Sequence, residues 1–234
     1  MPAGSPFPHG PVASVAEAIA RMEAIDAATP ASDGLACFNR MYLAVTEAVR
    51  AELSEGFYAD PEFMTALDVT FANLYFAAAD AASEPTTVPL AWRPLIERRD
   101  APGIEPIQFA LAGMNTHINH DLPLAVTGTC ADLATAPDTG AHFADFQKVD
   151  QLLDAAEQSI RQSFETNPEL AVDRHLQAVD NLVASWTINS ARDLAWQNAL
   201  VLWTLRPERA VSGLFLDGLA ATTALAGRLL LTAV

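Results

Sequence analysis

The chain has 234 residues, of which 51% are hydrophobic, so it is long enough to bury one sizeable core. Its formal net charge is −16, from 29 acidic and 13 basic side chains, which argues against nucleic acids and membrane surfaces as partners because both favour basic proteins. Cys37 and Cys130 form neither a CxxC motif nor a disulfide-rich pattern, and they favour a reduced, cytoplasmic location.

Residues 1–12 are rich in proline and glycine and predict a disordered tail, without the basic region and apolar run of a secretory signal. Residues 13–234 are expected to form a single helical domain, because helical periodicity dominates and strand alternation is nearly absent. The acidic exterior is compatible with a monomer or a homodimer.

The helical segments predict an all-α fold, a single-domain bundle of about eight helices with a central buried helix. Segment 61–83 begins with Asp60 as N-cap and Pro61 at the first helical position. It is apolar on nearly every side, which predicts that it is the central helix. The other predicted helices cover 13–28, 34–55, 106 to the histidines, 141–165 and 169–206, with an interruption near Thr187, where Ser190-Ala191-Arg192-Asp193 resembles a capping box.

The last stretch, GLFLDGLAATTALAGRLLLTAV, is long enough to raise the question of a membrane span. Asp217 and Arg228 interrupt it and no basic flank follows, so we expect a buried terminal helix and no membrane partner.

The stretch GMNTHINHDLP, residues 113–123, is unusually polar for this chain. On a helix, His117, His120 and Asp121 share a face with Gly113, whose missing side chain should leave room beside the rings. Pro123 cannot donate a hydrogen bond, so we expect a kink or restart that frees backbone acceptors nearby. The structural alternatives are that Asp121 caps a new helix and that His120 is a helix C-terminal histidine.

Asp68 shares the apolar face of segment 61–83, so its carboxylate is expected inside the protein. A buried unpaired carboxylate costs several kcal/mol or raises its pKa, and Asn73 poses a similar problem of buried polarity. A salt bridge or a helix cap is the structural alternative.

A stripe at helical spacing combines aromatic, aliphatic and polar side chains. Its tryptophans need no ligand to explain them. Asn189 and Asp193, with Arg192 adjacent, predict the wall of a polar pocket, unless Asp193 only closes the capping box. The stripe is His175, Val179, Leu182, Trp186, Asn189, Asp193, Trp196, Leu200 and Trp203.

These residues support acid–base chemistry, because imidazole titrates near neutrality and an aspartate can orient it or act as a base. A protonated histidine or an arginine would also stabilise a departing anion. The chain has no GxSxG elbow and no glycine-rich phosphate loop. The predicted catalytic residues are His117, His120, Asp121 and Asp68, and the predicted substrate-binding residues are Arg40, Asn73, Asn189, Arg192 and Asp193.

A metal is the alternative to this cofactor-free site. His117, His120, Asp68 and Asp121 are ligand types that suit one divalent ion, zinc or iron. HxxHD differs from HExxH, however, and the further ligands must come from distant segments, such as Asp68 or His175.

Five segments of the sequence are distinctive, namely 38–49, 60–76, 89–99, 106–126 and 191–196, and HINHDL at 117–122 is the most specific mark. They resemble a family of uncharacterised helical proteins from high-GC bacteria. The chain is also similar to aziridine-forming enzymes of specialised metabolism, which close a small nitrogen ring by expelling sulfate. That similarity implies that His117, His120 and Arg40 or Arg192 hold the leaving anion, while Asp68 or Asp121 takes a proton from the attacking amine.

Three hypotheses follow. The first is a small-molecule enzyme, a cyclase or lyase, that performs metal-independent acid–base cyclisation or elimination with an anionic leaving group. The second is a metal-dependent hydrolase that uses the same residues as ligands. The third is a non-catalytic ligand-binding or scaffold protein.

Overall fold

The computed structural model describes residues 9–84, 86–165 and 188–233, and the predicted segment 166–187, with His175, lies outside them. Within these ranges the structure is helical and contains no strand, which confirms the all-α prediction. The elements are α1 (Val15–Ala28), α2 (Gly34–Glu55), α3 (Pro61–Ala81), α4 (Arg93–Arg98), α5 (Pro106–Thr116), the π-helical turn η1 (His117–Asp121), α6 (Leu122–Asp132), α7 (His142–Glu165), α9 (Ile188–Leu205) and α10 (Arg209–Leu230).

The starts of the early helices follow from capping side chains. Asp33 accepts hydrogen bonds from the first turn of α2, and Asp60 accepts one from the Phe63 amide at the start of α3. The N-cap predicted at Asp60 is therefore confirmed. The capping box predicted at Ser190 does not start a helix, because α9 already includes Ile188.

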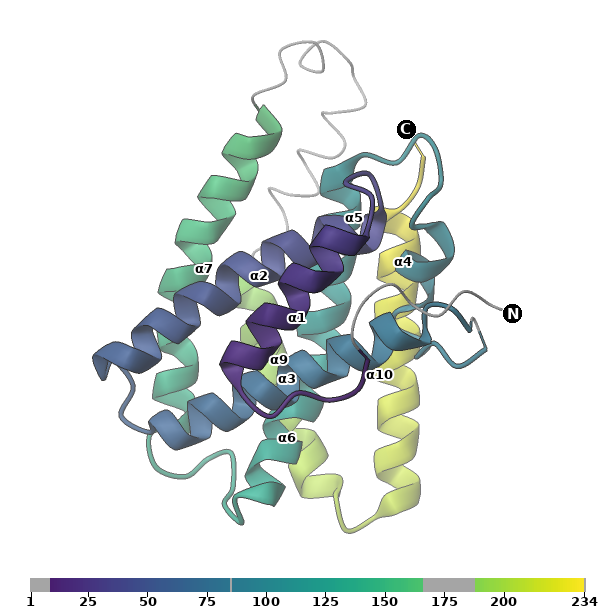
Figure 1. Cartoon of the computed structure of the whole chain (residues 1–234). Coiled ribbons are helices and arrows are strands. Elements are labelled where there is room, and N and C mark those ends of the chain that lie inside the picture. The colour runs from purple at the N-terminus through teal and green to yellow at the C-terminus, as the bar shows by residue number, and fades with distance from the viewer. Residues whose placement is uncertain (1–8, 85, 166–187, 234) are drawn as a thin grey trace.

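The most enclosed helix is α5, whereas the sequence pattern indicated segment 61–83. Every residue from Gln108 to Ile118 is buried, while α3 leaves one side partly open. α5 packs closely against α2 and α10, and α6 packs against α3 and α9 (Figure 1). Gly113 allows α5 to lie close to α2, because a Cβ at this position would lie 2.4 Å from the Phe38 ring.

The described part of the N-terminal segment is fixed by hydrogen bonds. Val12 exchanges two of them with the side chain of Asn73, at 2.8 and 2.9 Å. The Gly10 amide donates to Asp80, which also pairs with Arg21. The disordered tail predicted for 1–12 therefore does not include residues 10–12, and residues 1–8 lie outside the described chain.

Helix α10 stands at the edge of the bundle, on the side away from α7 (Figure 1). Leu214, Leu225 and Leu229 are 73%, 57% and 65% exposed, so the prediction of a buried terminal helix is wrong for this face. The face that meets the bundle consists of small residues, Ala220, Thr223, Ala224 and Gly227. By length and composition α10 is the one described helix that is apolar enough to cross a membrane.

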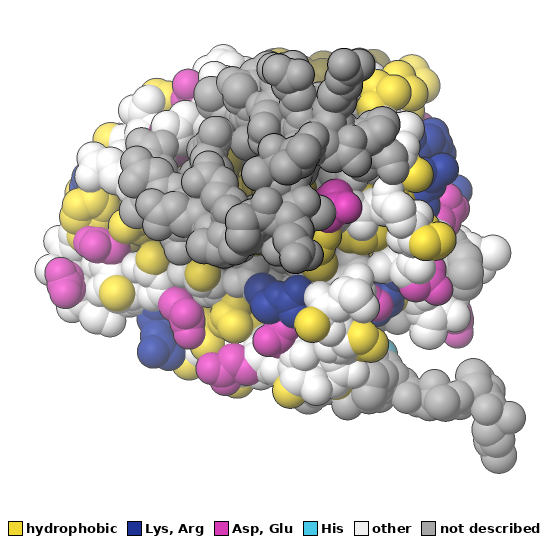
Figure 2. Space-filling model, turned by 90° about the horizontal axis from the view of Figure 1, so that it is seen from above, with side chains coloured by type: hydrophobic (Ala, Val, Ile, Leu, Met, Phe, Trp, Pro, Cys, Tyr) yellow, Lys and Arg dark blue, Asp and Glu magenta, His cyan; other side chains and the backbone are white. Residues whose placement is uncertain are grey.

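The surface reflects the composition of the chain. Figure 2 shows acidic, basic and apolar side chains intermixed over one face of the molecule. The net charge of −16 reflects an excess of acidic residues. On the described part of this face, the acidic side chains are spread among the others.

Candidate functional site

The histidine motif forms a single turn of π-helix between α5 and α6. The Leu122 amide donates to the His117 carbonyl, five residues earlier. Such turns are rare and often occur at functional sites. Pro123, which has no amide hydrogen, follows immediately and would crowd the carbonyl of Asn119 in a regular α-helix. The predicted interruption is therefore confirmed, in the form of a wider turn rather than a restart.

Asp121 is buried in this turn and accepts three hydrogen bonds. Its Oδ2 atom accepts from His117 Nδ1 at 3.0 Å and from Trp92 Nε1 at 2.9 Å, and its Oδ1 atom accepts from His120 Nδ1 at 2.7 Å. Burial alone would raise the pKa of Asp121, but the hydrogen bonds from His117 and His120 hold it below its usual value. Asp121 is thus a carboxylate that orients both rings, and it does not cap α6 with its side chain.

His117 is neutral and has a fixed tautomer. Burial lowers the pKa of His117, with an opposing contribution from its hydrogen bond to Asp121. Because the Asp121 carboxylate can only accept, the ring hydrogen of His117 sits on Nδ1. Nε2 is therefore a bare acceptor, and it is buried without a hydrogen-bond partner in the described part of the chain. The ring lies flat on Phe71, with centroids 3.5 Å apart.

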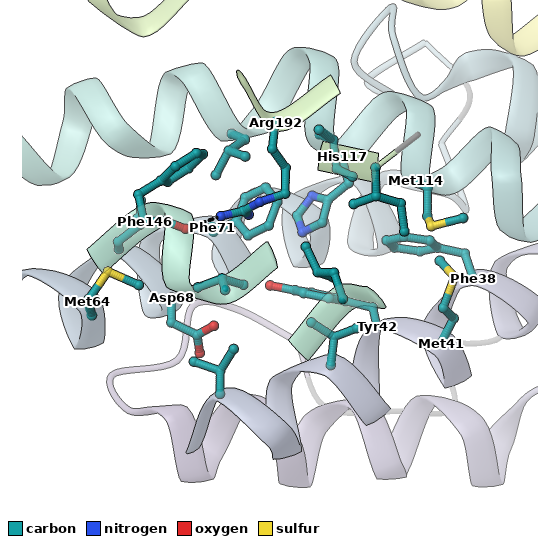
Figure 3. Close-up of a pocket in the computed structure, with 18 residues that line it drawn as sticks. Phe38, Met41, Tyr42, Met64, Asp68, Phe71, Met114, His117, Phe146 and Arg192 are labelled. Atoms are coloured by element: carbon teal, nitrogen blue, oxygen red, sulfur yellow. Dashed lines mark hydrogen bonds between the residues drawn. The ribbon is translucent and has the colours of Figure 1, made fainter. Parts of the chain in front are cut away.

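A cavity of about 80 Å³ lies beside this ring, between α2, α3, α5, α7 and α9 (Figure 3). Its walls are mostly methionine, phenylalanine and branched aliphatic side chains. Polar groups enter it from His117, Tyr42, Asp68 and Arg192. A cavity of this size has room for several water molecules or a small ligand.

Tyr42 and Asp68 supply two further buried polar groups at this cavity. Figure 3 shows the Tyr42 hydroxyl lying between the His117 ring and the Asp68 carboxylate. Neither this hydroxyl nor Asp68 Oδ2 has a hydrogen-bond partner among the described residues. Burial raises the pKa of Asp68 to about 7. Burial, together with the nearby Asp68, also raises the pKa of Tyr42 well above its usual value.

Arg192 reaches the cavity from α9 and is held firmly. Its Nε donates to Asp150 at 2.7 Å and its Nη2 donates to the Phe146 carbonyl at 2.6 Å. The guanidinium also lies 4.0 Å from the centre of the Phe146 ring. Burial lowers the pKa of Arg192, and the pairing with Asp150 opposes that effect.

The other predicted site residues do not line the cavity. His120 hydrogen-bonds to Asp121 but is not part of the cavity lining, because the wider π turn rotates its side chain away from that of His117. Arg40 pairs with Asp26 and the Ala31 carbonyl, and Asn73 holds the N-terminal segment. Asn189 is half-buried on the first turn of α9, and Asp193 is exposed to solvent.

Gly113 leaves no space beside the histidine ring, contrary to the prediction. Its open side is filled by Phe38, whose ring and Cβ atoms lie 2.4 to 2.6 Å from the position that a Cβ on Gly113 would take. The cavity lies instead between α2, α3 and α9, three helices that are far apart in the sequence.

The four alternative metal ligands are not brought together. Only His117 and Asp68 line the cavity, and both oxygens of Asp121 already accept hydrogen bonds. Within the described ranges there is no group of three or more His, Cys, Asp or Glu side chains arranged to hold a metal ion. His175 lies outside these ranges.

Two important side chains were not predicted as site residues. Tyr42 was assigned to the apolar face of segment 34–55. The sequence did hold one signal for it, because a hydroxyl on an otherwise buried face needs a hydrogen-bond partner. Trp92 belongs to the proline-rich connection, and no local pattern pairs it with Asp121, 29 residues later.

Together, the helices and the cavity define an all-α protein with a buried acid–base cluster. The chain belongs to a family of unknown function (DUF5995), whose model matches residues 15–233. No curated protein and no solved structure matches the chain. The function of this family is unknown, so the chemistry of the cavity is the guide to what the protein does.

Proposed function

We propose that this protein is a small-molecule enzyme that works by acid–base catalysis without a metal, in an elimination or ring closure that expels an anion. The supporting observation is that His117 Nε2, the Tyr42 hydroxyl and Asp68 Oδ2 share one cavity and lack partners among the described residues. Leaving a buried polar group unpaired costs about 1–3 kcal/mol. Three such groups at one cavity are typical of a functional site.

His117 is the general base in this proposal. The hydrogen bond to Asp121 fixes the ring hydrogen on Nδ1. The basic lone pair is therefore on Nε2, on the side of the ring away from Asp121. Because burial lowers the pKa of His117, the ring is neutral and ready to take a proton at pH 7. Asp121, His120 and Trp92 act as positioning residues, since they contact His117 or its partner rather than the cavity.

Asp68 and Arg192 complete the set of roles. With a pKa of about 7, Asp68 can give or accept a proton near neutrality. Arg192 is the cation among the described residues that line the cavity, and its bonds to Asp150 and Phe146 fix it where it would stabilise charge on a departing anion.

The metal-free part of the proposal is tested by elemental analysis of protein purified without a histidine tag. We expect far less than one zinc or iron per chain after gel filtration. A stoichiometric metal that returns after chelation and dialysis against the free ion would overturn the metal-free mechanism and favour the hydrolase.

The acid–base part is tested with nitroethane, a small carbon acid, whose α-hydrogen exchange in D₂O is followed by proton NMR. The native protein should accelerate exchange, and His117→Gln should reduce the acceleration roughly 100-fold. His142→Gln is the matched control, because His142 is also buried but pairs with Asp60 away from the cavity. Equal rates for the native protein and His117→Gln would defeat the proposal.

A further inference from the structure

We infer that the substrate is a small neutral carbonyl compound with an apolar body, whose oxygen is held by Tyr42 and Asp68 while an adjacent C–H bond faces His117. This inference rests on the proposed function and names the substrate class of the same site. It follows from the hydrogen-bonding capacity of each polar group at the cavity.

Tyr42 and Asp68 are the donors. Burial keeps the proton on the Tyr42 hydroxyl, and the raised pKa of Asp68 keeps a large share of that side chain in the acid form at neutral pH. Both have oxygen atoms without a partner in the described chain. A tyrosine and a protonated aspartic acid in an apolar cavity form a proven pair of donors for the oxygen of an enolate.

His117 has the opposite character. Its Nε2 atom can only accept, because Asp121 holds the ring hydrogen on Nδ1. It therefore cannot hold a carbonyl oxygen, but it can remove a hydrogen from the neighbouring carbon. Figure 3 shows the Tyr42 hydroxyl next to this ring, as a carbonyl and its α-carbon require.

The cavity walls favour a neutral ligand. Most of the lining is apolar, so a charged ligand would lose its hydration without a compensating group. Asp150 balances the positive charge of Arg192 in the resting site, so this charge does not call for an anionic ligand, although the guanidinium can still stabilise charge that develops on a leaving group. The volume of about 80 Å³ favours a compact body, since an apolar cavity of about 150 Å³ accepts benzene.

The chemical step is the transfer of one proton. His117 Nε2 takes the α-hydrogen as a proton, the C–H electron pair forms a C=C bond, and the carbonyl π pair moves to oxygen. Tyr42 and Asp68 donate hydrogen bonds to the resulting enolate. Return of the proton from His117 restores the ketone. If the β-carbon carries a leaving group, the oxygen pair of the enolate instead re-forms the C=O bond, and the enolate C=C pair becomes a new double bond between the α- and β-carbons. The leaving group departs with its bonding pair and takes the proton from His117.

The test uses acetone, with 2-propanol and 2-aminopropane as ligands of matched shape. Proton NMR in D₂O should show saturable exchange of the acetone α-hydrogens with the native protein, and binding in the order ketone, alcohol, amine. Tyr42→Phe should slow exchange roughly 100-fold. Tyr58→Phe is the matched control, because it removes another buried hydroxyl that lacks a described partner but does not line the cavity.

A measurement on the native protein covers the case in which Tyr42→Phe does not fold. The ¹³C signal of the bound acetone carbonyl should move downfield, because strong hydrogen bonds polarise it. An unshifted signal, absent saturable exchange, or full exchange by a folded Tyr42→Phe protein would overturn the inference. If the amine or alcohol binds while the ketone does not, the carbonyl class is wrong, and the nitroethane result still decides the proposed function.

Discussion

Asp121 is the residue on which the geometry of the cavity depends. It accepts from His117, His120 and Trp92, and these three bonds keep it ionised in a buried position. A carboxylate with three donors fixes both the tautomer and the orientation of His117. The pairing of His117 with Asp121 follows from their spacing of four residues in the sequence.

Asp68 makes stability depend on pH. Burial raises its pKa from 3.8 to about 7, so the folded protein binds this proton more tightly than the unfolded chain. The stability that this proton contributes is fully present below about pH 4 and is lost as the pH rises through 7. Each unit of pKa shift corresponds to about 1.4 kcal/mol, so the whole effect amounts to a few kcal/mol.

We therefore predict that Asp68→Asn, which keeps the shape but cannot ionise, gains stability relative to the native protein as pH rises. The difference in unfolding free energy should grow by a few kcal/mol between pH 4 and pH 8, measured by urea denaturation. Asp193→Asn, at an exposed position on α9, serves as control. A difference for Asp68→Asn that stays constant over this range would show that Asp68 is not desolvated.

At the scale of helices, close contact between α2 and α5 is set by Gly113. A Cβ there would lie 2.4 Å from the Phe38 ring, which is itself fully enclosed. We predict that Gly113→Ala lowers the unfolding free energy by about 1–3 kcal/mol. Gly128→Ala in α6 is the matched control, because its nearest neighbour would be Thr70 at 3.7 Å.

The control should be neutral or should raise stability by up to about 1 kcal/mol, since alanine favours a helix more than glycine does. Thermal and urea unfolding of both variants measure the difference. Equal effects of the two substitutions would mean that α2 and α5 are not in such close contact at Gly113. The same contact implies that Gly113→Leu perturbs folding rather than filling a ligand site.

The helices themselves could be predicted because their signals are local. Asp60-Pro61 marks the start of α3, and apolar spacing marks the bodies of α2 and α7. The π-helical turn could not be predicted as such. Pro123 requires that the regular α-helix be interrupted, but it does not determine whether the helix kinks, restarts or widens. That turn decides that His117 reaches the cavity and His120 does not.

At the scale of the whole molecule, helix α10 shows how composition and burial can differ. The helix is apolar, but Leu214 is 73% exposed, while Leu35 in α2 is completely buried. We predict that Leu214→Ala changes the unfolding free energy by less than about 0.5 kcal/mol, and Leu35→Ala lowers it by about 2–5 kcal/mol. A large loss for Leu214→Ala would mean that the outer face of α10 is covered in solution.

The composition of the site depends on contacts between distant segments. Local patterns indicated His117, Asp68 and Arg192, and all three line the same cavity. Tyr42 and Trp92 escaped prediction because their polar atoms matter only once α2, α4 and η1 are packed. Arg40 and Asn73 were predicted as binding residues, but their partners lie in α1, in the loop that follows it and in the N-terminal segment.

The protonation state of His117 is central to the proposed mechanism. ¹⁵N NMR of histidine-labelled protein measures it directly, with His117→Gln used to assign the signals. Between pH 6.5 and 8 we predict a neutral ring with its hydrogen on Nδ1 and a bare Nε2. Addition of acetone should shift the Nε2 signal. A ring that carries its hydrogen on Nε2, or that is positively charged at pH 7, would contradict the proposed base.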